Sequence, residues 1–215
     1  MLTERFSPQK RRQMESKMKN DRHGKKGPEM LLPVSLEYGE EGQVLRFDLW
    51  RMPQMLVTGG APDHQAAVVR KILDGWKTLP WIEPVIVNFP DRPAPGTETD
   101  PVGKLREMRK TLELRYRDLA GKGYKTAAEY LAGGHDDMPF HPVIILGFEK
   151  SAARPLPDEA VSLIHDLAIR GRAAGIDLVL CSTGAECPKG ELVCDFPAKL
   201  VLHGGGEKDF SFSHM

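Results

Sequence analysis

The chain has 215 residues, of which 40% are hydrophobic and 28% charged, a composition that excludes fibrous and disordered classes. This length is enough for one sizeable α/β domain with appendages. Because 30 Lys and Arg balance 30 Asp and Glu, no overall positive field indicates nucleic acid or membrane binding.

Neither targeting nor disulfide signals are present in the sequence. No run approaches the roughly 18 apolar residues of a membrane span, and the N-terminus is polar and basic, so we expect a cytoplasmic protein. Cys181, Cys187 and Cys194 are odd in number and lack paired spacing. They are typical of free cytosolic thiols, and we expect neither a disulfide framework nor a metal site.

Residues 1–30 carry nine Lys and Arg against four Asp and Glu, with few large apolar side chains. This composition predicts a flexible basic arm. The arm is either a solvated tail or a segment that binds DNA phosphates or an acidic partner surface. The basic residues proposed for such contacts are Lys10, Arg11, Arg12, Lys25 and Lys26.

Beyond the arm, the chain begins with a hairpin pattern and continues with a strand, a glycine turn and a helix. Two alternating apolar runs, 31–38 and 43–49, flank the polar turn GEEG. A strand at 55–58, a loop at 59–65 and a helix at about 66–76 follow, which is the context of a phosphate-binding loop.

The remaining elements alternate between strands and helices. We expect helix 102–119 with a short helical stretch at 127–131, and helix 158–174. A Pro-rich surface loop covers 91–101. Short apolar runs predict buried strands at 84–89, 142–146, 176–180 and 199–202. This order predicts an α/β fold with a mainly parallel sheet, helices on both faces and a preceding β-hairpin.

Three segments resemble the motor domain of the FtsK/SpoIIIE DNA translocases and their secretion and conjugation relatives. They are RGRAAGIDLVL at 170–180, LELRY at 112–116, and the hairpin LPVSLEYGEEGQVLRFDL that precedes MPQMLVTG. The resemblance covers about residues 32–202. It implies a RecA-like P-loop NTPase fold, ATP-driven movement along duplex DNA by a hexamer, and ATP sites shared between subunits. Since those motors continue with further strands, it also implies a domain at 31–215 that is truncated at its C-terminus.

The phosphate-binding loop departs from the family pattern GxxGxGK(S/T) at nearly every chemical position. Gly59 keeps the first glycine, whereas His64, Gln65 and Ala66 replace the last glycine, the lysine and the hydroxyl residue. Pro62 lacks an N–H to donate and Asp63 brings a negative charge. The degenerate loop comprises Gly59, Gly60, Ala61, Pro62, Asp63, His64, Gln65 and Ala66.

The catalytic strands depart as well. Gly147 and Phe148 stand where the family has its Walker B Asp and Glu, and Glu149 comes one place late. Thr183 stands at the sensor glutamine. These substitutions predict no catalytic residues and no bound cofactor. Asp177, where the family often has His, is predicted to be a polar residue at a strand edge.

We therefore expect a catalytically degenerate domain, a pseudo-ATPase that binds or regulates an active translocase or a secretion or conjugation protein, with duplex DNA as a further partner. One alternative is a divergent ATP-binding translocase that uses Mg²⁺ and Glu149. Another is a peptide-docking module of a secretion system. A weaker alternative gathers His64, His135, Asp136, Asp137, His141 and His203 at the carboxyl edge of the sheet, as a metal or acid–base site.

Overall fold

In a computed structural model of the chain, the structure describes residues 29–39, 41–52, 54–89, 100–147, 156–182, 196, 198–204 and 208–214. The expected basic arm therefore lies almost entirely outside the described residues. The elements are β1 (Pro33–Tyr38), β2 (Gln43–Asp48), β3 (Met55–Gly59), α2 (Pro62–Trp76), β4 (Val85–Asn88), α3 (Pro101–Gly121), α4 (Ala127–Ala132), β5 (His141–Leu146), α5 (Asp158–Arg170), the 3-10 turn η1 (Arg172–Ala174), β6 (Ile176–Ser182), β7 (Ala198–Leu202) and β8 (Phe210–His214).

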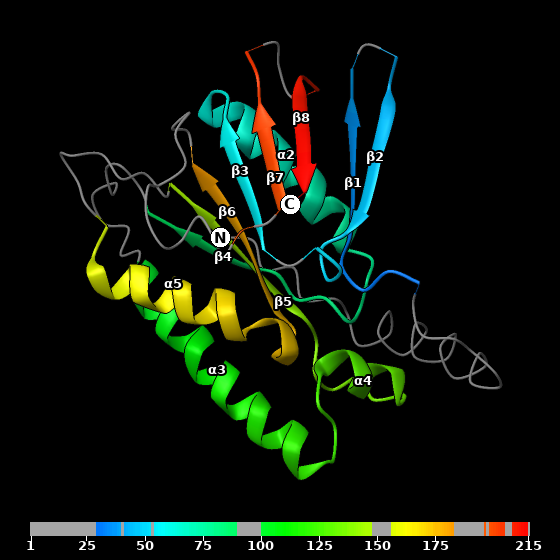
Figure 1. Ribbon diagram of the computed structural model, residues 1–215, viewed down its shortest axis with the longest axis vertical. Helices are drawn as coiled ribbons and strands as arrows, with labels where there is room; N and C mark the ends of the chain where they lie inside the picture. Colours follow the sequence, from blue (N-terminus) through cyan, green and yellow to red (C-terminus); the bar gives the residue numbers. More distant parts are fainter. Residues whose placement is uncertain are drawn as a thin grey trace, which may run out of the picture.

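The main sheet has six strands in the order β4-β5-β6-β3-β7-β8, and every neighbouring pair is parallel except the antiparallel pair β7 and β8 (Figure 1). Helices connect β3 to β4, β4 to β5 and β5 to β6, as the parallel pairing of these strands requires. The predicted mainly parallel sheet is confirmed, and the β1–β2 hairpin forms a separate two-stranded sheet.

Helices cover both faces of the sheet. In β6, Leu178 and Leu180 belong to the apolar core that α3 and α5 complete, whereas Val179 and Cys181 face the core of the other side. This alternation follows from the two-residue period of a strand. The second core is closed by α2, α4 and the hairpin, and Figure 1 shows α3 and α5 together on one side.

The hairpin rests against the C-terminal strand β8. Tyr38 packs on Phe210 with ring centroids 5.7 Å apart, and Phe47 stacks on Phe212 at 4.9 Å. The backbone N–H of Gly39 donates to the carbonyl of Lys208 at 3.0 Å. The hairpin comes from the beginning of the described chain and β8 from its end. Their contact therefore brings the two ends of the described chain together.

Apart from the glycine turn after β3, the end of α5 and the strand β8 differ from the sequence prediction. The helix expected at 158–174 ends at Arg170, and the backbone carbonyl of Gly171 accepts from the N–H of Ile176 at 3.0 Å, so the chain turns toward β6 here. A Cβ at Gly171 would lie 2.3 Å from the carbonyl oxygen of Ile176, so this close approach requires glycine. A 3-10 turn follows, and Gly175 at φ 72° leads into β6. Strand β8 was not predicted, because its Phe-Ser-Phe-Ser pattern is short and was assigned to a tail.

Candidate functional site

The glycine turn after β3 is much shorter than the predicted loop at 59–65. Strand β3 ends at Gly59, and α2 begins at Pro62, so only Gly60 and Ala61 connect them. The expected helix start near Ala66 was wrong. Pro62 explains the early start, since proline is favoured in the first helical turn, where its missing N–H costs no hydrogen bond. The residues that would line a phosphate loop lie in a helix.

Gln65 stands at the lysine position of the motif, and its side chain lies between the carboxyl ends of β3 and β6. Its side chain is buried, and its Nε2 donates to the carbonyl of Gly59 at 2.9 Å and to the carbonyl of Ser182 at 2.7 Å. Gly59 ends β3 and Ser182 ends β6. The amide therefore joins the turn to the strand that leads to the sensor position, and both of its N–H groups are used within the fold.

The end of β7 closes the other side of the turn. A Cβ placed on Gly59 would lie 2.5 Å from the carbonyl oxygen of Leu202, and one on Gly60 would lie 2.9 Å from the Cβ of Leu202. Both glycines have positive φ, 75° and 66°. Glycine is thus required here by backbone geometry and close packing.

The first turn of α2 carries a negative charge, which disfavours the binding of an anion. Ala61 provides no side-chain cap, and Asp63 places an exposed carboxylate in the first turn. Ala66 presents only a methyl group where Mg²⁺ would need a hydroxyl. His64 has a buried Nδ1 without a hydrogen-bond partner among the described residues. The residues of this turn do not fit a Mg²⁺-triphosphate.

Gly147 directly follows β5 in a conformation that does not fit the family's Walker B aspartate. Its φ is 70°, and a Cβ there would lie 2.3 Å from the carbonyl oxygen of Phe89. Any larger residue at this position must displace the backbone beyond β4. Phe148, Glu149 and Thr183 lie outside the described residues, so their predicted roles remain predictions.

Two of the segments that resemble the family, LELRY in α3 and the start of 170–180, contact each other directly. Arg115 is buried and donates to the carbonyls of Ala174 and Pro139 at 2.9 and 2.5 Å. Tyr116 donates its hydroxyl to the carbonyl of Arg170 at 2.7 Å. Burial lowers the pKa of Arg115 to about 10, yet the guanidinium stays charged at neutral pH. Through these hydrogen bonds, Arg115 and Tyr116 of LELRY hold α3 against the turn before β6, so their role is structural.

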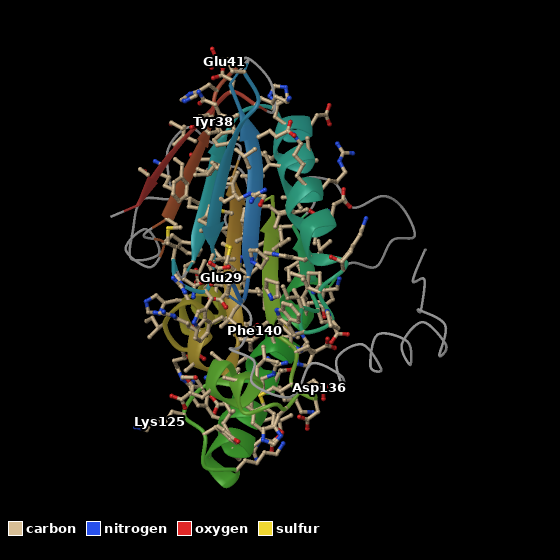
Figure 2. The ribbon with its side chains drawn as sticks, turned by 90° about the vertical axis from the view of Figure 1, so that its right-hand side faces the viewer. Glu29, Tyr38, Glu41, Lys125, Asp136 and Phe140 are labelled. Carbon is tan, nitrogen blue, oxygen red and sulfur yellow. The ribbon has the colours of Figure 1, made fainter. Side chains whose placement is uncertain are left out.

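The structure contradicts the weaker alternative, in which histidines gather at the carboxyl edge of the sheet. His64 in α2 and His203 after β7 lie at the carboxyl ends of the strands, whereas His141 begins β5 at the opposite end. Asp136 also precedes β5, and Figure 2 shows it below Phe140, far from the hairpin tip at Glu41. Among the residues that the structure describes, no three His, Cys, Asp or Glu side chains form a group that would hold a metal ion.

Asp177 is misassigned by sequence reasoning. It is 0% exposed rather than at a strand edge, and both carboxylate oxygens lack a hydrogen-bond partner in the described part of the chain. Burial raises the pKa of this carboxyl to about 8, against a downward effect of Arg172 and an additional upward effect of Asp48. Its position inside the apolar run IDLVL at 176–180 was the sequence signal for burial.

The described helices include none that is long and apolar enough to cross a membrane.

No protein-family profile and no curated protein matches the sequence. Solved structures do match. The cytoplasmic domain of the Thermomonospora curvata type VII secretion ATPase EccC aligns with a TM-score of 0.66 at 16% identity, over 84% of this chain and 25% of that one. ATPases 2 and 3 of Geobacillus thermodenitrificans EssC align with a TM-score of 0.61 at 17% identity, over 79% and 36%.

A conjugation protein gives a similar match. The pCW3 coupling protein TcpA, in its monomer form with ATPγS, aligns with a TM-score of 0.63 at 17% identity, over 87% of this chain and 64% of that one. The chain thus spans between a quarter and just under two thirds of these proteins. With this sheet order, the chain has the RecA-like fold of FtsK/SpoIIIE-type P-loop ATPase domains, as the resemblance predicted.

Proposed function

We propose that this chain is a catalytically degenerate FtsK/SpoIIIE-like domain, a pseudo-ATPase, that acts as a binding or regulatory subunit of a DNA-translocation, conjugation or secretion motor. The observation that carries this proposal is the Gln65 amide. It lies at the lysine position and donates both N–H groups to Gly59 and Ser182.

The length of the turn supports the same reading. A phosphate-binding loop needs several backbone N–H groups directed inward from a wide turn, followed by the helix N-terminus. Here only two residues, Gly60 and Ala61, separate the end of β3 from the start of α2 at Pro62. The backbone that would surround a β-phosphate is already helical, and its N–H groups serve the first turns of α2.

Triphosphate binding depends on hydrogen bonds to charged phosphate oxygens. A hydrogen bond to a charged group contributes about 1.5–3 kcal/mol. Losing the lysine, the Mg²⁺ hydroxyl and one or more backbone donors would therefore weaken triphosphate binding by several orders of magnitude. Asp63 in the first turn of α2 adds repulsion.

Retention of the fold without these contacts supports a role in binding. The similar structures are parts of secretion and conjugation ATPases. We infer that the partner of this chain is a related active motor or another component of such a system. In a mixed ring, an inert subunit of the same fold would occupy a motor position without hydrolysing ATP.

Calorimetric titration of the purified chain with Mg²⁺-ATP tests this proposal. We expect no saturable heat up to millimolar nucleotide, and no ATP hydrolysis above a buffer blank. Gln65→Lys, which restores the motif lysine alone, should also fail to bind. Saturable binding by the wild-type chain with a Kd of about 1–100 μM would refute the proposal and favour the divergent translocase.

A second candidate, the peptide-docking module, is favoured by one comparison. ATPases 2 and 3 of Thermomonospora curvata EccC have been solved in complex with a signal sequence peptide, and this chain aligns with them at a TM-score of 0.54. Pull-down of the full chain with and without nuclease would separate the partner classes. A protein that stays bound after nuclease treatment supports peptide or subunit docking, whereas loss of all bound material supports DNA.

A further inference from the structure

A cavity of about 220 Å³ opens between the base of the hairpin and α4. Its apolar wall is formed by Leu31, Trp50, Ala128 and Ala132, and its polar wall by Glu29, Asp48 and Arg51. The two alanines of α4 contribute only methyl groups, so the wall leaves space that a longer side chain would fill. This space is the size of a side chain and has a largely apolar lining.

Asp48 holds the cavity wall in place and presents little charge to a ligand. Its side chain is 4% exposed, and its carboxylate accepts the backbone N–H groups of Leu31 and Trp50 at 3.1 Å and of Leu32 at 2.8 Å. These bonds satisfy the buried charge within the fold. They also fix the wall before any ligand arrives, which lowers the cost of ordering it on binding.

Two exposed arginines lie beside the cavity. The side chain of Arg51 is 73% exposed, and its Nε lies 3.8 Å from Asp48. The guanidinium carbon of Arg172 lies 5.1 Å from the ring centroid of Trp50, and within the described part of the chain Arg172 makes no ion pair. The accessible carboxylate at the cavity is that of Glu29, so exposed positive charge is in excess.

This combination of groups selects one kind of ligand. Tryptophan and arginine are the residues most often found at the energetic centre of protein interfaces, and a guanidinium pairs with a carboxylate in a bidentate geometry. A lysine or arginine side chain would meet like charge here. A nucleic acid phosphate would find the arginines but would supply no aliphatic group for the apolar wall. An apolar side chain with carboxylates beside it satisfies both parts of the surface.

We propose that the cavity is a docking site for an acidic segment of a partner protein. One apolar side chain of the segment enters between Trp50 and α4, and its neighbouring carboxylates pair with Arg51 and Arg172. The inference rests on the proposed function, because the segment then belongs to the motor or secretion protein that the degenerate domain binds. Trp50 contacts Phe140, just before β5, so the site lies at the end of the sheet opposite the Gln65 turn.

An NMR titration of the full-length ¹⁵N-labelled chain with a synthetic peptide tests the site. The probe is acetyl-Asp-Asp-Leu-Asp-Asp-amide, and the readout is the indole N–H resonance of Trp50, assigned with Trp50→Phe. We expect a saturable shift with a Kd on the order of 0.1–1 mM. The peptides with Asn in place of every Asp, or with Ala in place of Leu, should bind more weakly, because each lacks one part of the match.

Arg172→Gln and Arg51→Gln test the charged half of the site. Both positions are exposed, so the variants should fold, and each should raise the Kd roughly three- to tenfold. The matched control Arg117→Gln changes an exposed arginine of α3 that does not line the cavity, and it should leave the Kd unchanged. Ala128→Leu, which fills the apolar half, should abolish binding while the indole resonance of the buried Trp76 stays in place.

Three results would overturn the proposal. They are a Trp50 resonance that does not respond to millimolar peptide, a Kd that Arg172→Gln and Arg51→Gln leave unchanged, and a response to a short DNA duplex in place of the peptide. The calorimetric titration with Mg²⁺-ATP reports on the Gln65 turn alone. A failure of peptide docking is therefore distinguishable from a failure of the pseudo-ATPase role.

Discussion

Gln65 and Asp177 are both buried polar side chains, but their opposite states of hydrogen bonding lead to opposite expectations for mutation. Gln65 uses its amide to join the ends of β3 and β6, whereas Asp177 has no partner in the described chain. Removing the first should destabilise the fold, and neutralising the second should stabilise it at neutral pH.

Replacing Gln65 by Ala should lower the free energy of unfolding by about 1–3 kcal/mol, because two buried carbonyl groups lose their donor. The matched control is Asp63→Ala, an exposed position in the same helical turn, which should change stability by less than about 0.5 kcal/mol. Urea unfolding followed by circular dichroism measures both. Equal effects of the two substitutions would contradict the role given to the Gln65 amide.

For Asp177→Asn, the expected effect depends on pH. The folded-state pKa of about 8 lies above the ordinary 3.8, so between these values the folded chain holds a proton that the unfolded chain releases. Wild-type stability should thus fall as pH rises from about 4 to about 8 and then level off. The variant should lose this dependence, match the wild type near pH 4, and have the higher Tm at pH 8. A wild-type Tm that Asp177 does not make pH-dependent would contradict the raised pKa.

At the scale of elements, the carboxyl end of β5 depends on one glycine. Gly147→Ala should destabilise the fold more than the left-handed conformation alone requires, about 1–2 kcal/mol, because the added Cβ meets the carbonyl of Phe89. Gly134→Ala is the matched control, since its φ is 88° and its Cβ would have nothing within 4 Å. Chemical unfolding measures the free energy of unfolding of both variants, and the difference between them is the steric cost at Gly147. An equal loss of stability in the two variants would show that the backbone at Phe89 moves aside freely.

Arg115 connects α3 to the turn before β6 through its hydrogen bonds. Arg115→Ala should cost about 2–4 kcal/mol, because the carbonyls of Ala174 and Pro139 lose a charged donor in a buried place. Arg106, also in α3, makes an exposed ion pair with Glu159 of α5, and Arg106→Ala should cost much less than Arg115→Ala. Thermal melts at low and high salt compare them, and only the Arg106 effect should shrink with salt. A small, salt-sensitive effect of Arg115→Ala would count against a structural role.

The sequence predicted the hairpin, the strands from β3 to β7 and the helical layers, because buried parallel strands give continuous apolar runs and amphipathic helices have a clear period. It misplaced the start of α2, since a glycine turn with motif spacing suggested a loop where Pro62 in fact begins the helix. It missed β8, whose two phenylalanines pack on the hairpin through contacts distant in sequence. Asp177 was misjudged because burial of a polar residue is set by tertiary packing.

At the scale of the whole molecule, equal numbers of acidic and basic residues mean that any DNA binding must come from local charge. We expect a variant with Lys10, Arg11, Arg12, Lys25 and Lys26 changed to Ala to lose affinity for duplex DNA. Wild-type binding, if carried by phosphate contacts, should weaken steeply with salt. A gel shift at several salt concentrations measures both. Binding that is unchanged in the variant would assign DNA recognition to another surface.

The contact of Leu202 with Gly59 has an evolutionary consequence. Backbone atoms of β7 occupy the space beside the turn, as those of Phe89 do beside Gly147. A side chain at either position would meet a backbone carbonyl oxygen of another segment, so both glycines are expected to persist in any relative that keeps this spacing of strands, whether or not that relative binds a nucleotide.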